Sequence, residues 1–150
     1  MGLEDILSRV ELFQGLESDE LRLIGTLFHE MAYQRGEMIT TQGSAGDSFS
    51  IISDGFVEVS ITGRAEGSAG DSQVLINLGR GQIFGEMSLV DQGLRSASVS
   101  AISDRTVVYT ADRTGFLALC EDHPHIGFVV MRNIAADLSF KLRKQNLYRG

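Results

Sequence analysis

The sequence predicts a single, mainly β domain, a sandwich or barrel, with helices at both ends. Short strand-like stretches alternate with turn signals about every 8–12 residues through the middle of the chain, a spacing typical of small all-β domains. The 17 glycines against one proline suit many tight turns. Helical periodicity is confined to the two ends. With 150 residues, the chain is long enough for one domain with a sizeable core.

The first 31 residues are predicted to be helical. Leu3, Ile6 and Leu7 have the spacing of an amphipathic helix. Ser18 can cap a second helix, because its hydroxyl can accept a hydrogen bond from a free N–H of the first turn. The buried stripe of this second helix is predicted to contain Leu21, Ile24, Leu27, Phe28 and Met31.

Residues 32–111 are predicted to form the β part of the domain. The strand-like stretches are 37–41, 48–53, 56–61, 73–78, 99–101 and 106–110. Asp54-Gly55 predicts a hairpin between the second and third of these, because a type I′ turn needs positive φ at both central residues. The small, polar residues 62–71 predict a longer hairpin loop.

Residues 112–147 are predicted to be helical again. Asp112 can cap a short helix, and Pro124 suits the first turn of the next one, where its missing N–H does no harm. His123 and His125 are interpreted as part of that helix start, since no further ligands at metal-site spacing accompany them. The last helix carries two apolar stripes, more than packing on one barrel requires. The second stripe is open to two interpretations, a broad contact with the core or a homodimer formed through this helix.

Composition limits the classes of partner. The net charge of −7 argues against direct binding to nucleic acid and against attraction to anionic lipid. The sequence contains no uninterrupted apolar run of about 18 residues and no basic, apolar leader at its start. One cysteine excludes an internal disulfide. We therefore expect a cytoplasmic domain with no membrane segment.

The stretch 84–99 concentrates the groups that could hold a ligand. Gly85 allows close approach of the backbone, since it has no Cβ. Glu86 can accept hydrogen bonds from sugar hydroxyls, and Arg95 offers a planar fork of donors suited to a phosphate. Ser96 adds a hydroxyl beside that fork, and 87–90 could form one helical turn whose N–H groups face the same anion. The stretch predicts a site for a phosphorylated sugar.

The motifs Phe84-Gly85-Glu86-x-x-Leu89 and Arg95-Ser96-Ala97, set between these helices, resemble the cyclic nucleotide-binding domain. This domain occurs in bacterial catabolite-activator regulators, protein kinase A regulatory subunits and nucleotide-gated channels. The resemblance runs from about Val10 to Leu142. It implies an eight-strand antiparallel β-roll (a double-stranded β-helix, jelly-roll-like) with N-terminal helices and a C-terminal hinge and lid helix pair, in one domain over 1–150. Further matching stretches are 12–16, 36–39 and 52–55, and Phe116 with Leu119.

The resemblance also implies roles for individual residues. Glu86 would bind the ribose 2′-hydroxyl, and Arg95 would pair with the cyclic phosphate. Leu75 and Ile76 would line the base pocket. The other expected ligand-binding residues are Gly85, Met87 and Ser88 in the turn around Glu86, and Ser96 and Ala97 beside Arg95.

The function implied by the resemblance is a sensor that is not an enzyme. Its ligand would be cyclic AMP rather than cyclic GMP, since cyclic AMP is commoner in the family, with no metal or other cofactor. Leu89 would pack against the hinge at Phe116, so that ligand binding moves the last helix as a lid over the base. The effector domain or partner protein would lie outside this chain.

Other interpretations stay open from the sequence. Glu86 and Arg95 could form an ordinary surface ion pair, worth about 0–1 kcal/mol. The chain could be a degenerate, non-binding member that serves interaction or dimerisation. A cupin-like metal enzyme is disfavoured, because the predicted strands lack the histidines that would hold the metal. Titration with cyclic nucleotides separates the sensor from the other two classes.

Overall fold

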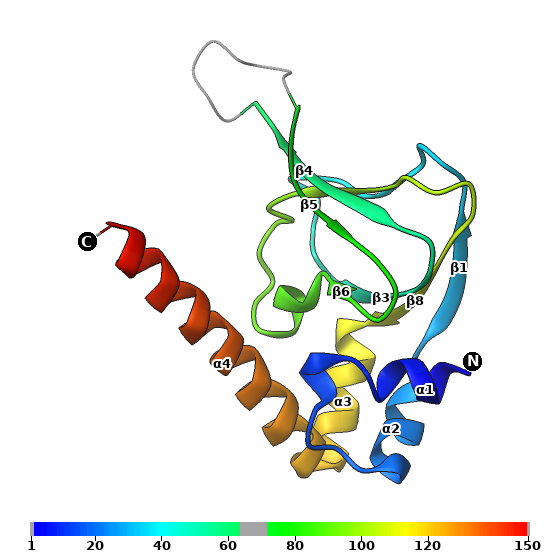
Figure 1. The fold of residues 1–150 in the computed structure, drawn as a ribbon. Coiled ribbons are helices and arrows are strands. Elements are labelled where there is room, and N and C mark those ends of the chain that lie inside the picture. Colours follow the sequence, from blue (N-terminus) through cyan, green and yellow to red (C-terminus); the bar gives the residue numbers. More distant parts are fainter. Residues whose placement is uncertain (1, 64–71, 150) are drawn as a thin grey trace.

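The computed structural model describes residues 2–63 and 72–149, with side chains described as far as residue 145. Within these residues, eight antiparallel strands form two four-stranded sheets, ordered β1-β8-β3-β6 and β2-β7-β4-β5. Helices precede the first strand and follow the last (Figure 1). The predicted fold class, a mainly β roll with flanking helices, is confirmed. From residue 64 on, the predicted 62–71 loop lies outside the described residues.

The elements match most of the predicted stretches within one or two residues. The strands are β1 (His29–Tyr33), β2 (Met38–Thr40), β3 (Ser48–Asp54), β4 (Val57–Thr62), β5 (Ser72–Leu78), β6 (Ile83–Phe84), β7 (Ser98–Ala101) and β8 (Thr106–Asp112). The helices are α1 (Leu3–Leu7), the 3-10 turn η1 (Glu11–Phe13), α2 (Ser18–Gly25), the 3-10 turn η2 (Glu86–Leu89), α3 (Arg113–Asp122) and α4 (Pro124–Arg149).

The N-terminal helices end earlier than predicted. Helix α2 stops at Gly25, and β1 begins at His29, so the prediction of helix through Met31 is wrong. The reason is tertiary: β1 pairs antiparallel with β8, which satisfies its backbone groups, and Met31 is 44% exposed instead of buried. The predicted cap at Ser18 is displaced by one residue. Glu17 is the N-cap, and its N–H donates to Glu20 Oε1 at 3.0 Å in a capping box.

The turn at Asp54-Gly55 is not a hairpin. Strand β3 pairs with β6 and β8, whereas β4 pairs with β5 and β7, so the chain passes here from one sheet to the other. Gly55 has φ +81°, but no described residue other than glycine has positive φ, which rules out the type I′ turn. The N–H of Ile102 donates to the carbonyl of Phe56 at 3.0 Å and holds the crossing in place.

The core has two parts, one inside the roll and one at its base, where the helices pack. The base cluster includes residues of α1, α2, η1 and α4 together with Phe49, Leu89 and Phe116. Phe49 makes edge-to-face contacts with Phe28 and Phe116, at ring centroid distances of 5.5 and 5.4 Å. The roll cluster contains Ile52, Val57, Phe84, Val99 and Val108.

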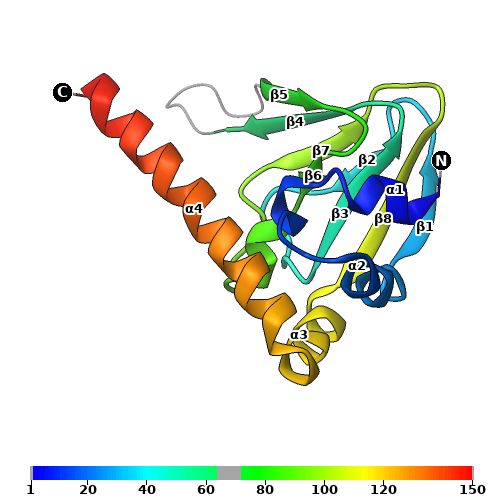
Figure 2. The ribbon, with the colours of Figure 1, turned by 60° about the horizontal axis from the view of Figure 1, so that its bottom comes forward.

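Helix α4 is anchored at its beginning and extends away from the base of the roll (Figure 2). Ile126, Val130 and Ile134 are buried in the base cluster. Asn133 Nδ2 donates to the carbonyls of Leu12 and Gln14, at 2.8 and 2.9 Å. The first half of α4 is therefore fixed to the N-terminal segment, while its second half carries exposed apolar side chains such as Phe140.

None of the described helices is both long enough and apolar enough to span a membrane.

Gly55 and Gly36 allow a matched test of the crossing between the sheets. Both have positive φ, but a Cβ on Gly55 would lie 2.7 Å from the Arg105 carbonyl oxygen, whereas one on Gly36 would meet open space. We expect Gly36→Ala to lower the free energy of unfolding by about 1 kcal/mol, from backbone strain alone. Gly55→Ala should cost about 2–4 kcal/mol, because overpacking is added. Urea denaturation measures both free energies of unfolding. Equal losses of stability in the two variants would show that the close approach of Gly55 to the Arg105 carbonyl is not important for the fold.

Candidate functional site

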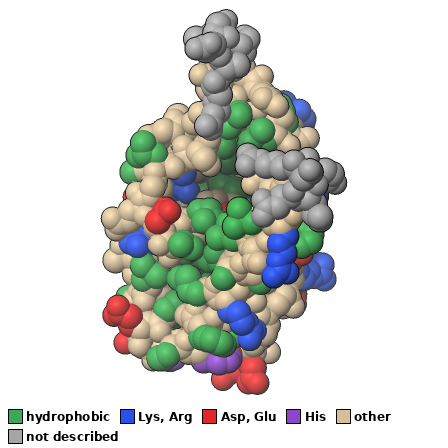
Figure 3. All heavy atoms as spheres, turned by 90° about the vertical axis from the view of Figure 1, so that its left-hand side faces the viewer, with side chains coloured by type: hydrophobic (Ala, Val, Ile, Leu, Met, Phe, Trp, Pro, Cys, Tyr) green, Lys and Arg blue, Asp and Glu red, His purple; other side chains and the backbone are tan. Residues whose placement is uncertain are grey.

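The candidate site is a cavity of about 370 Å³ between η2, the loop before β7 and the inner face of the β2-β7-β4-β5 sheet. Figure 3 shows a hollow bordered by hydrophobic side chains on this face of the molecule. All seven residues predicted to bind the ligand line this cavity. They are Gly85, Glu86, Met87, Ser88, Arg95, Ser96 and Ala97. The structure thus brings the two ends of the 84–99 stretch together around one space.

Gly85 is required for the positions of Arg95 and η2. Its φ is +81°, in the left-handed region that suits glycine. A Cβ at this position would lie 2.6 Å from Arg95 Nη1 and 2.9 Å from the Ser48 carbonyl oxygen. The arginine can therefore lie across the turn only because the side chain is absent. The turn itself, η2, begins one residue before the predicted 87–90 turn, and the Ser88 N–H donates to the Gly85 carbonyl at 3.1 Å.

Arg95 is held at one end of the cavity by the beginning of β3. Its Nη2 donates to the carbonyl oxygen of Ser48 at 2.8 Å and to the hydroxyl of Ser48 at 3.2 Å. Burial lowers the pKa of Arg95, while the carboxylates of Asp47 and Glu86 raise it, and a guanidinium stays charged at any physiological pH. The side chain presents a positive charge to the cavity from a fixed position.

Glu86 is half-buried in the wall of the same cavity. Burial raises the pKa of its carboxyl group, and this effect is opposed by its own backbone N–H and by the charges of Lys141 and Arg95. The surface ion pair between Glu86 and Arg95 that the sequence left open is not formed, because Arg95 is bonded to Ser48 instead. Lys141, from α4, lines the cavity and pairs with Asp137 at 2.9 Å. The carboxylate of Glu86 and the guanidinium of Arg95 are therefore not paired with each other, and each can contact a different part of a ligand.

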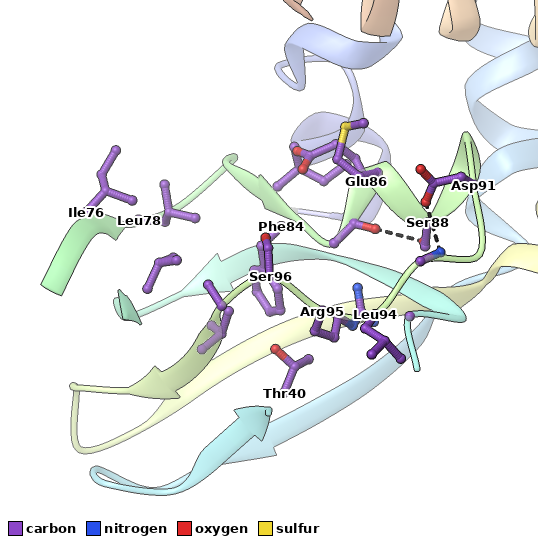
Figure 4. A pocket seen from close by; sticks show the side chains of 18 of the residues that line it. Thr40, Ile76, Leu78, Phe84, Glu86, Ser88, Asp91, Leu94, Arg95 and Ser96 are labelled. Atoms are coloured by element: carbon purple, nitrogen blue, oxygen red, sulfur yellow. Dashed lines mark hydrogen bonds between the residues drawn. The ribbon is translucent and has the colours of Figure 1, made fainter. Parts of the chain in front are cut away.

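The end of the cavity away from Arg95 is apolar. Ile76 and Leu78 of β5 lie together there, as Figure 4 shows, and Val59 of β4 also lines the cavity. Leu75, predicted with Ile76 for this wall, does not line it. Val59 pairs with Ile76 and Ser60 with Val74, so Leu75 is the extra residue of a β-bulge.

Sequence reasoning missed several lining residues. Alternation along β5 could have identified Leu78, two positions after Ile76, because side chains two apart share a face. The resemblance places 141–143 in the lid region over the base without assigning a contact, and the structure brings Lys141 of this region to the cavity through the course of α4. The lining residues not predicted include Thr40, Gly46, Val59, Leu78 and Ile83.

The two residues predicted to connect the site with the hinge lie in the same core cluster. Leu89, at the end of η2, is 2% exposed, and Phe116, on α3, is fully buried. Elements η2 and α3 are also in direct contact. The structure therefore places the cavity wall against the first of the two C-terminal helices.

The arrangement suits a ligand with three different parts. The fixed cation at Arg95 suits an anionic group, and the carboxylate of Glu86 suits hydroxyl donors. The apolar wall of Ile76 and Leu78 suits a flat, weakly polar group. Among the residues that the structure describes, no three His, Cys, Asp or Glu side chains are grouped as metal ligands would be.

Comparison with known proteins gives consistent matches. A family model described as "Cyclic nucleotide-binding domain" matches residues 30–123, more than half of the chain. The "Cyclic AMP receptor protein" of Thermus thermophilus is 36% identical over 91% of this chain and 59% of its own length. The "cGMP-dependent protein kinase egl-4" of Caenorhabditis elegans is 31% identical over 80% of this chain and 15% of the kinase. The chain thus spans less than two thirds of these relatives.

Solved structures agree on the fold. The crystal structure of Thermus thermophilus catabolite activator protein matches with a TM-score of 0.78 and 36% identity, covering 92% of this chain and 61% of that one. The N-terminal domain of a transcriptional regulator from Streptomyces coelicolor matches with a TM-score of 0.81, covering 97% and 96% of the two chains. At 23% identity, the second match supports the fold alone.

The raised pKa of Glu86 predicts a pH-dependent penalty on folding. A carboxyl whose pKa is higher in the folded state costs stability above that pKa, where it must ionise while buried, and the cost disappears as the pH falls below its ordinary value of 4.5. We expect Glu86→Gln to be more stable than the parent at pH 7, with the difference shrinking towards pH 4. Urea denaturation across this range measures it, with the exposed-strand variant Glu30→Gln as the control. A difference that is constant with pH would contradict the prediction.

Proposed function

Because the chain belongs to the cyclic nucleotide-binding domain family, we propose that this cavity holds a 3′,5′-cyclic nucleotide and that the domain is a sensor without catalytic activity. One observation carries the proposal: Arg95, Glu86 and the apolar wall at Ile76 line a single cavity, and the two charged side chains are not paired with each other. A 3′,5′-cyclic nucleotide has one anionic group, one free ribose hydroxyl and one flat base, which match these three features.

In the proposed complex, Arg95 pairs with the cyclic phosphate, because a phosphate removed from water is stable only when it is paired and hydrogen-bonded. Glu86 accepts the hydrogen bond of the ribose 2′-hydroxyl, which stays free in a 3′,5′-cyclic nucleotide. Ser96 and Ala97 complete the cradle next to the phosphate. The base lies against Ile76.

Cyclic AMP is the proposed ligand, with cyclic GMP as the alternative. The name of the Thermus relative refers to cyclic AMP, while the matching kinases are named for cyclic GMP. The two nucleotides share the phosphate and ribose that Arg95 and Glu86 would bind, so both are expected to enter the cavity. A titration with each nucleotide decides between them.

We propose that binding is converted into movement of α4. Leu89 contacts the base cluster that contains Phe116, so a shift of η2 on binding would alter the packing under α3. The second half of α4, which carries Lys141 in the cavity wall, would then close over the base. Such a movement is a shift between two populations, and its size is limited by the difference in ligand affinity between them.

We also propose a homodimer formed through α4 and an effector on another domain or chain. Phe128, Phe140 and Leu142 are 62, 66 and 59% exposed on this helix, and a second copy of α4 would remove apolar side chains such as Phe140 from water. The relatives are longer than this chain, and the effector would lie in such an additional region or in a partner protein. The net charge of −7 disfavours direct contact of this domain with nucleic acid.

Titration calorimetry with cyclic AMP and cyclic GMP tests the proposed site. We expect Arg95→Leu to weaken binding by about 2–5 kcal/mol, roughly 30- to 5,000-fold, because the buried phosphate loses its cation. The parent should bind 2′-deoxy cyclic AMP more weakly than cyclic AMP, and Glu86→Gln should reduce this discrimination.

Arg105→Leu, in the turn between β7 and β8, is the control and should leave affinity unchanged. The absence of binding at millimolar nucleotide would contradict the sensor function and favour the interaction module. Parent affinity in Arg95→Leu would contradict the assignment of the site.

Sedimentation velocity tests the proposed dimer. We expect the parent to sediment as a dimer at micromolar concentration and Phe140→Glu to sediment as a monomer, because a charge in an apolar interface is costly to desolvate. Gln145→Glu, at an exposed position on a different side of the helix from Phe140, should stay dimeric. A monomeric parent at all concentrations would show that the exposed side chains serve another purpose.

A further inference from the structure

A continuous set of polar contacts connects Arg95 with the first residue of α3. Arg95 Nη2 donates to the Ser48 carbonyl at 2.8 Å. The Ser88 hydroxyl lies 3.1 Å from the same carbonyl and 2.8 Å from the Gly85 carbonyl, so it can donate its one proton to either of them. Arg113 Nε, in turn, donates to the Ser88 carbonyl at 2.7 Å. Four residues from four parts of the chain thus form one hydrogen-bonded path.

The path is sheltered from solvent. Ser88, at its centre, is 5% exposed, and Ser48, Arg95 and Arg113 are half-buried. Hydrogen bonds in such surroundings are stronger than in water, and a lost partner is more costly. The loss of a hydrogen bond at Arg95 therefore costs free energy, and a movement of Arg113 at the other end of the path can restore part of it by improving the remaining bonds.

Arg113 is attached to both sides of this path. Besides the bond from its side chain to Ser88, its backbone N–H donates to the Asp47 carbonyl at 2.8 Å, directly before Ser48. It is also the first residue of α3, which packs against α4. If η2 moved relative to β3, Arg113 could not keep both bonds unchanged, and the direction in which α3 begins would change with it.

The Ser48 carbonyl is the contact that a ligand would disturb. It accepts from both Arg95 and Ser88 in this structure. A phosphate carries a full negative charge whereas the Ser48 carbonyl is neutral, so an anion at Arg95 competes with the carbonyl for the guanidinium donors. If an anion weakened the bond from Arg95 to the Ser48 carbonyl, the Ser88 hydroxyl would become the main donor to that carbonyl, which would draw η2 towards β3.

We propose that Arg113 is a positioning residue that transmits the occupancy of the cavity from Ser48 and Ser88 to α3 and α4. This inference rests on the proposed function and adds a polar route to the apolar contact between Leu89 and Phe116. The two routes differ in kind. Apolar packing has no directional preference, whereas the bond from Arg113 to the Ser88 carbonyl fixes where α3 starts relative to η2.

Distance measurement between two spin labels tests the route. The labels are placed at Met38→Cys on the roll and Arg143→Cys on α4, in a Cys120→Ser background, and cyclic AMP or cyclic GMP is added to saturation. We expect the nucleotide to shift the distance distribution in the parent. Arg113→Met keeps the length of the side chain without its donor. It should retain less than half of that shift while still binding nucleotide within about tenfold of the parent affinity by calorimetry.

Matched variants separate positioning from a general structural effect. Arg113→Lys keeps a cationic donor and should recover most of the shift, and Arg105→Met should behave like the parent. Leu89→Ala measures the apolar route alone. If Arg113→Met does not fold, Ser88→Ala interrupts the same path from its other side and should also reduce the shift.

The outcomes distinguish this inference from the proposed function. A full shift in Arg113→Met, or no recovery in Arg113→Lys, would overturn the role of Arg113 while leaving the sensor function intact. A parent that binds nucleotide without any shift would overturn both the movement of α4 and this route. A parent that binds no nucleotide would overturn the proposed function itself.

Discussion

The bond from Arg95 to the Ser48 carbonyl is the interaction on which the rest of the site depends. A guanidinium taken partly out of water must find acceptors, and here it finds them on the first residue of β3. This placement requires that Gly85 have no side chain, since a Cβ would overlap both partners. The positive φ of Gly85 also sets the start of η2. One glycine thus determines the position of the cation and the course of the turn that carries Glu86.

The cavity keeps its two opposite charges apart. If Glu86 and Arg95 paired with each other, a ligand would first have to break that pair. Instead, Arg95 is bonded to Ser48, and Glu86 bears the cost of burial, which raises its pKa. Part of the stability of the fold is therefore given up at this position, and a hydroxyl donor from a ligand would compensate for it. A carboxyl group whose pKa is shifted by burial in a cavity wall is typical of binding sites.

Helix α4 combines a fixed half with an exposed half. Its first turns belong to the base cluster, and Asn133 bonds them to the N-terminal segment. Beyond Leu138, which packs at the edge of that cluster, Lys141 reaches the cavity wall and Phe140 is 66% exposed. One end of α4 is therefore anchored in the base cluster, and its other half contributes to the cavity wall.

The sequence by itself determined the fold class and seven residues, between Gly85 and Ala97, that line the cavity. These are local matters: turn residues and periodicity reflect backbone preferences, and residues close in the chain stay close in space. Only the tertiary structure decided that β1 begins at His29, that the chain changes sheet at Gly55, and that Leu75 is displaced by a bulge. It alone brought Lys141 to the cavity and Arg113 to Ser88. Each of these depends on a pairing or contact between segments that are distant in the sequence. The free energy of such a contact depends on both segments, so it cannot be predicted from the residues of one segment alone.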